Sequence, residues 1–189
     1  MTNYGRFVAA SHFINHLGFE GALFRLSFVI SFESKAKMMT WRVIAVGKPK
    51  LRFAAEGIQE YLVRIRRFAS CETLFLSPAR PEQLITSILK ESEQSFRVIL
   101  DERGEQSSSE ELAEFISRHQ VRATRRIALI VGGAEGHAEQ IRSQADWLWA
   151  LSRLTLQHEL ALMLALEQVY RAYAILSGAP YHRPTSPRS

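Results

Sequence analysis

The chain has 189 residues, of which 47% are hydrophobic and 23% are charged, and it carries a formal net charge of +5 with a sequence pI near 9.7. This length allows one domain with a sizeable core and excludes two large ones, and the composition excludes a largely disordered chain. The positive charge is compatible with RNA as a partner without requiring it, and the single cysteine, Cys71, excludes an intrachain disulfide and predicts a reducing, cytoplasmic compartment.

The first 38 residues differ from the rest of the chain. Their longest apolar run, residues 22–32, is interrupted by Arg25 and is too short to span a bilayer. They lack the basic start, the uninterrupted apolar stretch and the small-residue cleavage site of a signal peptide. We expect residues 1–38 to be an N-terminal extension that is poorly ordered or translated from an over-extended start. A genuine accessory or targeting segment is the alternative, and no membrane association is expected.

From Trp41 onward, strand-like and helix-like stretches alternate, which is typical of a parallel sheet covered by helices. The expected strands are residues 41–46, 71–76, 97–101, 126–131 and 147–151. The expected helices are residues 51–68, 81–95, the stretch from the serines at 107–109 to about His119, 138–145 and 159–177. In the first of these helices, the residues expected on the buried face are Leu51, Phe53 or Ala54, Ile58, Leu62 and Ile65. The sequence predicts one α/β domain over residues 39–183, followed by a short tail at 184–189.

The final expected helix, residues 159–177, is apolar on nearly every face. Its hydrophobic residues include Leu160, Leu162, Met163, Leu164, Leu166, Val169, Tyr170, Tyr173, Ile175 and Leu176. A helix that is apolar all round must be covered on both sides. A single small domain is expected to cover only one side, so this helix predicts a homodimer.

A glycine-rich turn, Gly132-Gly133-Ala134-Glu135-Gly136, follows the strand expected at 126–131. The carboxyl end of a strand is where α/β sheets usually bind ligands, and glycine lets backbone amides approach a small molecule closely. The turn does not match Gly-x-Gly-x-x-Gly or the Walker pattern, which argues against a nicotinamide-dependent enzyme and a nucleoside triphosphate site. Taken alone, the turn is best explained as a tight strand-to-helix connection without a ligand.

Three further segments carry polar groups that are ambiguous by themselves. Residues 100–104, Leu-Asp-Glu-Arg-Gly, form a charged loop after a strand, which is most often simply solvated. In residues 151–158, His158 could act in catalysis, cap a helix or lie in the core. Residues 181–183, Tyr-His-Arg, stand at a chain end, where a loose tail is the usual expectation. The same three side chains are nonetheless suited to stacking on a base, titrating near neutral pH and holding a phosphate.

The order and spacing of these pieces resemble the cofactor-binding end of the SPOUT (α/β-knot) RNA methyltransferases. The Tyr-His-Arg ending is similar to that of the ribosomal RNA large subunit methyltransferase H family, and the resemblance covers about residues 39–183. It implies a parallel-sheet α/β-knot fold with a C-terminal trefoil knot, a homodimer, S-adenosyl-L-methionine as cofactor and no metal. General packing rules would not predict the knot, which enters through the resemblance alone.

The resemblance also implies roles for particular residues. The residues expected to bind the cofactor are Leu100, Gly104, Gly132, Gly133, Gly136, Leu151, Ser152, Leu154, Thr155 and Leu156. Tyr181, His182 and Arg183 are expected to position the substrate and to take part in proton removal. His158 and Arg171 are expected to contact the substrate or the dimer partner. Two positions depart from the family pattern, since Ala134 replaces a proline and Leu162 an arginine.

The substrate implied by the resemblance is a pseudouridine of 23S ribosomal RNA, nucleotide 1915, methylated at ring nitrogen N3 within the assembled ribosome. With no separate RNA-binding domain visible, the small core offers little surface for recognising a free RNA hairpin. Two alternatives remain open. One is a methyltransferase of the same fold that acts on another RNA nucleotide, such as a tRNA ribose, and the other is a ribosome-binding relative without catalytic activity.

Overall fold

Five parallel strands form one sheet in residues 39–181, the part of the chain that the computed structural model describes. The strands are β1 (Thr40–Val46), β2 (Ser70–Leu76), β3 (Phe96–Gln106), β4 (Arg126–Val131) and β5 (Trp147–Ala150). Their order across the sheet is β2-β1-β4-β3-β5, and every neighbouring pair is parallel. The predicted parallel α/β sheet is confirmed. The predicted extension at 1–38 and the tail at 184–189 lie outside the described residues.

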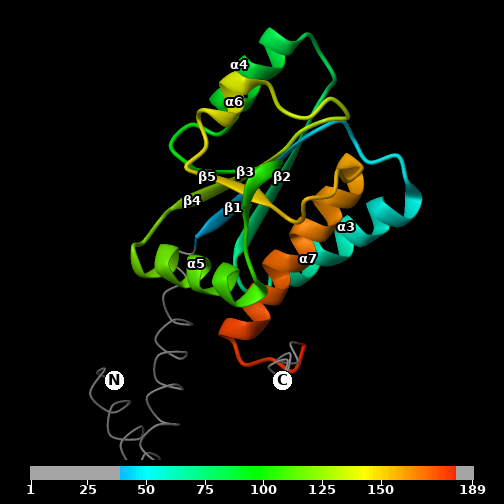
Figure 1. Ribbon diagram of the computed structural model, residues 1–189. Helices are drawn as coiled ribbons and strands as arrows, with labels where there is room; N and C mark the ends of the chain where they lie inside the picture. The colour runs from blue at the N-terminus through cyan, green and yellow to red at the C-terminus, as the bar shows by residue number, and fades with distance from the viewer. Residues whose placement is uncertain (1–38, 182–189) are drawn as a thin grey trace, which may run out of the picture. The chain divides into compact units, whose positions relative to one another are not determined.

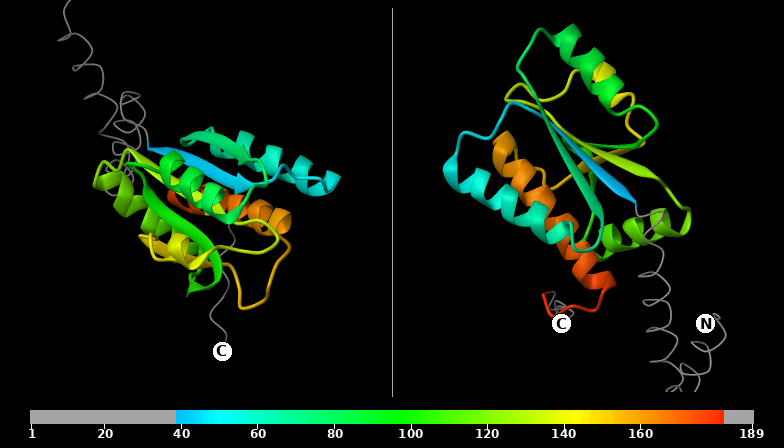
Figure 2. Two further views of the ribbon diagram at one scale, coloured as in Figure 1. Left: turned by 90° about the horizontal axis from the view of Figure 1, so that it is seen from above. Right: turned by 180° about the vertical axis from the view of Figure 1, so that it is seen from behind.

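Helices cover both faces of this sheet (Figures 1 and 2). On one face lie α3 (Arg52–Ile65), α5 (Ser109–Val121) and α7 (His158–Leu176), and on the other lie α4 (Pro81–Glu91) and α6 (Glu139–Arg142). Side chains therefore alternate between two cores along each central strand, so that in β1 Trp41 and Val43 face the first core while Ile44 faces the second. Within residues 39–181, no helix combines enough length and apolar character to cross a membrane.

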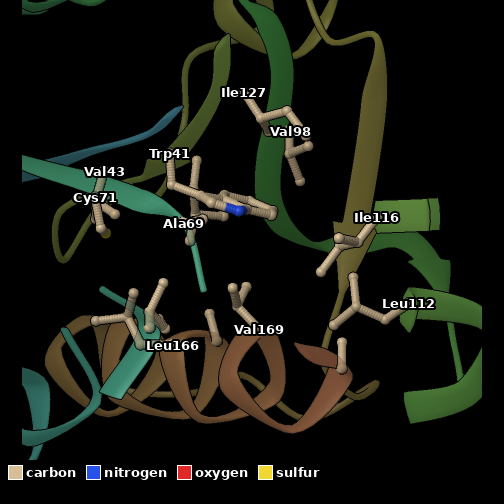
Figure 3. Close-up of a cluster of buried hydrophobic side chains, with 14 of the residues drawn as sticks. Trp41, Val43, Ala69, Cys71, Val98, Leu112, Ile116, Ile127, Leu166 and Val169 are labelled. Carbon is tan, nitrogen blue, oxygen red and sulfur yellow. The ribbon is translucent and has the colours of Figure 1, made fainter. Parts of the chain in front are cut away.

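The larger core lies between the sheet and the layer of α3, α5 and α7 (Figure 3). Trp41 is fully buried there, and its indole Nε1 donates a hydrogen bond to the Tyr173 hydroxyl at 3.0 Å. Because Tyr173 also stacks on Phe68 with ring centroids 5.6 Å apart, α7 is joined to the sheet by aromatic packing and by a satisfied polar contact. This fixes α7, whose first turn borders the site described below.

Helix α7 is covered within its own chain more completely than the sequence analysis assumed. It packs against α3 and α5 as well as the sheet, and Leu162 and Leu166 are buried in the core. Gly57 of α3 permits close approach, since a Cβ there would collide with the Met163 sulfur. Leu164 remains exposed, and the homodimer stays a prediction.

Strand β3 is longer than predicted, ending at Gln106 rather than residue 101. Leu100 pairs with Trp149 of β5, and after a bulge Glu105 pairs with the same tryptophan. The segment between them passes so close to β5 that a Cβ on Gly104 would lie 2.5 Å from the carbonyl oxygen of Leu148. A glycine is therefore required at position 104 to let the two backbones approach this closely.

The other boundaries differ by smaller amounts. Helix α4 ends at Glu91, short of residue 95, and Gln94 has a φ of +56°, which lies outside the right-handed helical region. The serines do start α5, where Ser108 and Glu111 form a reciprocal capping box. On α3, Ala54 rather than Phe53 faces the core, and Leu51 and Phe53 are exposed.

Candidate functional site

A pocket of about 520 Å³, part of it open to solvent, lies at the carboxyl ends of the central strands. Three segments that are distant in sequence build it: the end of β3, the turn after β4, and the loop that leads from β5 into α7. The lining residues are Leu100, Asp101, Glu102, Val131, Gly132, Gly133, Gly136, His137, Leu151, Ser152, Leu154, Leu156, His158 and Ala161. Its place at the carboxyl ends of parallel strands is that of a small-molecule site.

The turn after β4 owes its shape to its glycines. The Gly136 amide donates to the Gly133 carbonyl oxygen at 3.1 Å, and Gly136 has a φ of +71°, which side chains other than glycine rarely adopt. A Cβ on Gly132 would lie 2.9 Å from the backbone of Gly136. Larger residues at these two positions would open the turn, so the glycines keep it closed beside the pocket.

The loop after β5 presents both apolar and polar groups to the pocket. The Ser152 hydroxyl accepts a hydrogen bond from the Leu154 amide at 3.0 Å, which turns the loop back toward α7. Gln157 caps α7 by accepting from two backbone amides, so the cap is not His158. His158 is the first residue of the helix and lines the pocket, with Nε2 3.8 Å from the Glu159 carboxylate.

Glu159 anchors the loop after β1 to the start of α7. It is buried, and its Oε2 accepts hydrogen bonds from the backbone amides of Lys50 and Leu51, both at 2.8 Å. A carboxylate near a helix N-terminus is also stabilised by the helix dipole. The β1–α3 loop, whose Lys48 and Lys50 side chains are exposed, is thereby held close to His158, which lines the pocket.

Two buried polar residues that line the pocket, Asp101 and His137, lie beside Arg142, which does not line it. The Arg142 Nε donates to Asp101 Oδ2 at 2.8 Å, and the Arg103 amide donates to Asp101 Oδ1 at 3.1 Å. Burial opposes ionisation of Asp101, but the hydrogen bonds and positive charge around it together outweigh burial and lower its pKa. Asp101 is therefore an ionised, fully engaged carboxylate that joins the end of β3 to α6.

His137 is buried beside this ion pair and borders the pocket. Burial, followed by the charge of Arg142, lowers its pKa in spite of the opposing charge of Asp101 and a hydrogen bond to the Leu100 backbone. The ring is thus neutral at physiological pH.

The structure brings together most of the residues predicted to bind a cofactor. Those that line the pocket are Leu100, Gly132, Gly133, Gly136, Leu151, Ser152, Leu154 and Leu156, and His158 joins them. Gly104 and Thr155 do not line it, because Gly104 lies against the β5 backbone and Thr155 is exposed. Sequence reasoning did not single out Asp101, His137 or Ala161, whose proximity to the pocket depends on contacts distant in sequence.

The C-terminal Tyr181 lies away from the pocket of its own chain. Its hydroxyl donates to Glu167 Oε1 at 3.1 Å, and its ring packs edge-on against Tyr170 at 4.8 Å between centroids. Burial, then Tyr61 and Glu167, raise its pKa. Arg171, predicted to face substrate or partner, also binds Glu167. His182 and Arg183 lie outside the described residues.

No group of three or more histidine, cysteine, aspartate or glutamate side chains in residues 39–181 is arranged to hold a metal ion. Cys71 is buried within the core and apart from the pocket, and burial raises the pKa of its thiol to about 11. The pocket lining offers the glycine turn, leucine side chains and the polar side chains of Asp101, Glu102, His137, Ser152 and His158.

Comparisons with known proteins identify relatives of this arrangement. Residues 39–182 match the family described as "Predicted SPOUT methyltransferase". A protein of Thermus thermophilus named "Ribosomal RNA large subunit methyltransferase H" is 44% identical over 146 residues, which cover 77% of this chain and all of that protein. A protein of the same name from Deinococcus radiodurans is 39% identical over 145 residues, which cover 77% of this chain and 99% of that protein. Another from Synechococcus is 42% identical over 142 residues, which cover 75% of this chain and 93% of that protein.

Proposed function

Because the chain belongs to the SPOUT methyltransferase family, we propose that it methylates large-subunit ribosomal RNA with S-adenosyl-L-methionine as methyl donor. The observation that carries this proposal is the pocket at the carboxyl ends of the strands, which gathers eight of the ten residues predicted to bind the cofactor. The substrate class follows from the names of relatives that match 75–77% of the chain.

The residues of the pocket fit this cofactor. Leu100, Leu154 and Leu156 offer apolar surfaces for a purine ring, and the glycine turn places backbone in the wall of the pocket. The lining also includes the exposed carboxylate of Glu102, which favours a ligand with cationic groups. When bound, the cofactor supplies an electrophilic methyl carbon on a sulfonium sulfur.

For the chemistry, we propose that N3 of a pseudouridine is the methyl acceptor. This nitrogen carries a proton in the neutral base, so its proton must pass to a base as the N–C bond forms. His182 and Arg183 suit the roles of proton acceptor and anion stabiliser, and Tyr181 suits stacking on the nucleotide. The remaining contribution of the enzyme is orientation, which requires the tail to stand next to a bound cofactor.

Tyr181 is held far from the pocket of its own chain. Helix α7 rises about 1.5 Å per residue, so Tyr170, which contacts Tyr181, lies roughly 18 Å along the axis from His158 at the pocket. We therefore propose a homodimer in which the tail of one subunit completes the pocket of the other. Exposed Leu164 on α7 and Val63 on α3 supply apolar surface for such an interface. We also propose that the chain has the C-terminal trefoil knot that the family resemblance implies.

We propose that the natural target is the assembled ribosome in the cytoplasm. Residues 39–181 contain one α/β domain and no separate RNA-binding module, so recognition of a hairpin depends on surfaces that the ribosome contributes. The β1–α3 loop carries exposed Lys48 and Lys50 near the pocket, where they can meet phosphates. Action on tRNA and ribosome binding without catalysis are the alternatives.

The test is methyl transfer from labelled cofactor by the full-length chain to unmethylated assembled ribosomes, free large subunits and tRNA in parallel. Label confined to the large-subunit RNA of assembled ribosomes supports the proposal, and mapping the label to N3 of a pseudouridine supports its finer part. Label in tRNA keeps the chemistry and changes the substrate. Cofactor binding without label on any RNA favours the non-catalytic relative. His182→Ala and Arg183→Ala should lower transfer far more than cofactor binding.

A further inference from the structure

Five arginines gather at the amino ends of three neighbouring strands, the ends opposite the pocket. Strands β2, β1 and β4 lie side by side, and their register places Ser70 and Arg126 on either side of Thr40 (Figure 2). Neighbouring strands are about 4.8 Å apart, so the turn from α3 into β2 and the turn from α5 into β4 lie roughly 10 Å from each other. These two turns and the first residue of β4 hold the amino-end arginine cluster, which consists of Arg66, Arg67, Arg122, Arg125 and Arg126.

The amino-end arginine cluster carries positive charge that the described residues do not neutralise. Four of its side chains are exposed and Arg126 is partly exposed, and none of the five forms an ion pair within residues 39–181. The acidic residues nearest to the two turns in sequence already bind other arginines, in the pairs Glu60–Arg64, Glu72–Arg42 and Glu114–Arg118. Removing five of the 24 basic residues would leave 19, the number of acidic residues, so the cluster equals the net charge of the whole chain.

The positive charge is gathered on one side of this end of the sheet. The connections that lead into β3 and β5 carry Glu93 and Asp146 and contain no arginine or lysine. Cations that gather without counter-charges repel one another, and such a surface is typical of one that binds an anionic partner. The guanidinium group suits phosphate in particular, because its planar fork can donate two parallel hydrogen bonds to phosphate oxygens.

The amino-end arginine cluster is too far from the pocket of its own chain to hold the nucleotide that enters it. Arg126 starts β4, and Val131, which lines the pocket, ends the same strand, so the two positions are roughly 16 Å apart. We propose that the cluster binds the phosphate backbone of large-subunit ribosomal RNA at a segment separate from the methylated nucleotide. This inference rests on the proposed function for the identity of the RNA, and it deepens that function by naming a docking surface. Phosphate contacts of this kind fix position and orientation without reading sequence.

The first test measures binding of the full-length chain to unmethylated assembled ribosomes over a series of salt concentrations. The cluster variant combines Arg67→Gln, Arg122→Gln and Arg125→Gln, whose side chains form no hydrogen bond or ion pair within the described part of the chain. Its affinity for ribosomes should fall about tenfold or more at low salt. Each phosphate contact contributes about 0.7–0.9 to the slope of log affinity against log salt concentration, so this slope should become shallower by about 2 to 3.

The control variant removes the same charge from scattered exposed positions, by Arg52→Gln, Arg80→Gln and Lys90→Gln. It should lose much less affinity, because long-range attraction falls in both variants but only the cluster variant loses contacts. At saturating ribosome concentration both variants should keep the kcat of the unchanged chain, so the cluster variant raises only the KM for ribosomes. Calorimetric titration with S-adenosylhomocysteine should give one affinity for all three proteins, and thermal unfolding verifies that each variant is folded.

A second test identifies the partner with a photoreactive amino acid in place of Val121. This residue is 84% exposed and adjoins Arg122 at the end of α5. Irradiation of the complex with ribosomes should join this position to large-subunit ribosomal RNA. Ribonuclease digestion should then leave an RNA fragment on the protein, and the fragment should not contain the methylated nucleotide.

Three outcomes would overturn the inference. The first is an equal loss of ribosome affinity in the cluster variant and the control variant, which would mean an effect of net charge only. The second is a cross-link from position 121 to a ribosomal protein instead of RNA, and the third is a cross-link to the methylated nucleotide itself. Each of these leaves methyl transfer by the unchanged chain, and so the proposed function, intact. An unchanged chain that docks through the cluster but transfers no methyl group to any RNA would instead remove the proposed activity and keep the docking surface.

Discussion

The hydroxyl of Tyr181 donates to Oε1 of Glu167 at 3.1 Å, and the same oxygen accepts two hydrogen bonds from Arg171, at 2.6 and 3.0 Å. The Arg171 guanidinium also lies over the Tyr181 ring, 4.9 Å from its centroid. Glu167 is buried on α7 and takes a further hydrogen bond from Gln168. The Glu167 carboxylate thus fixes Tyr181, the residue that precedes His182.

The Glu167→Gln variant should therefore lower methyl transfer about tenfold or more and leave cofactor affinity unchanged. Loss of the charge weakens the bonds to Arg171 and Tyr181, and hydrogen bonds to charged groups contribute about 1.5–3 kcal/mol each. Single-turnover transfer to ribosomes and calorimetric titration of the cofactor separate the two effects. Glu56→Gln, which changes a surface pair with Arg52, is the control and should alter neither. A loss of cofactor affinity equal to the loss of transfer would contradict a role in directing the tail.

Gly104→Ala should destabilise the fold by about 1–3 kcal/mol. The added Cβ would meet the Leu148 carbonyl oxygen at 2.5 Å, and backbone cannot move aside as a side chain does. Gly133→Ala is the comparison, because its Cβ meets only the Val46 side chain, at 3.3 Å, and should cost less. Urea unfolding monitored by tryptophan fluorescence measures both. Unchanged stability of Gly104→Ala would show that the backbones of β3 and β5 do not approach each other closely at Gly104.

The pairing of β3 with β5 also shows why the sequence predicted the sheet but not its full extent. Alternation of apolar strands with helices is a local pattern, and it located every strand and helix of residues 39–181 within a few positions. Residues 102–106, Glu-Arg-Gly-Glu-Gln, look locally like a solvated loop. They are part of β3 because Glu105 and Gln106 pair with β5, about 45 residues away, and such pairing leaves no periodic signal.

Parts of the candidate site could also be predicted from local sequence, whereas other parts depend on contacts between residues that are distant in sequence. Its glycine turn and the loop at 151–156 are visible as motifs, since their backbone requirements act through neighbouring residues. Asp101 lies within a predicted segment, yet its role comes from Arg142, 41 residues later. His137 follows the motif directly, but its burial beside Asp101 and Arg142 depends on contacts that are distant in sequence. Leu162, a departure from the family pattern, is a core residue here.

Asp101→Asn should destabilise the protein by about 1–3 kcal/mol, the cost of leaving a buried polar group without a full partner. The Asp101 side chain is almost completely buried, and asparagine replaces one of its two acceptor oxygens by an amide donor, so either the Arg142 bond or the Arg103 amide bond is lost and the charge that faces Arg142 disappears. Glu60→Gln provides the control, because that residue pairs with Arg64 on the surface, where ion pairs contribute little. The free energy of unfolding in urea at pH 7 measures the difference. Equal effects of the two substitutions would mean that the Asp101–Arg142 pair is solvated.

Stability should decline as pH falls below about 6.5, because two buried histidines are neutral in the folded state. Burial lowers the pKa of His137, and burial with the charges of Arg122 and Arg118 lowers that of His119. Since both folded pKa values lie below the unfolded value of 6.5, the unfolded chain binds more protons in the interval between them. The free energy of unfolding is therefore complete above about pH 6.5, falls through the interval and levels off below the folded pKa values.

Urea unfolding at half-unit steps from about pH 8 to pH 5 tests this sign. Each histidine can contribute a slope of at most about 1.4 kcal/mol per pH unit. Asp101 adds nothing in this range, because its lowered pKa and the usual aspartate value both lie below about pH 5. His137→Gln and His119→Gln should each flatten the curve, since glutamine does not titrate, and the double variant should flatten it most. Stability that rises toward the acid end of the series would mean that the folded protein binds protons at these sites more tightly than the unfolded chain, which is incompatible with neutral, buried imidazoles.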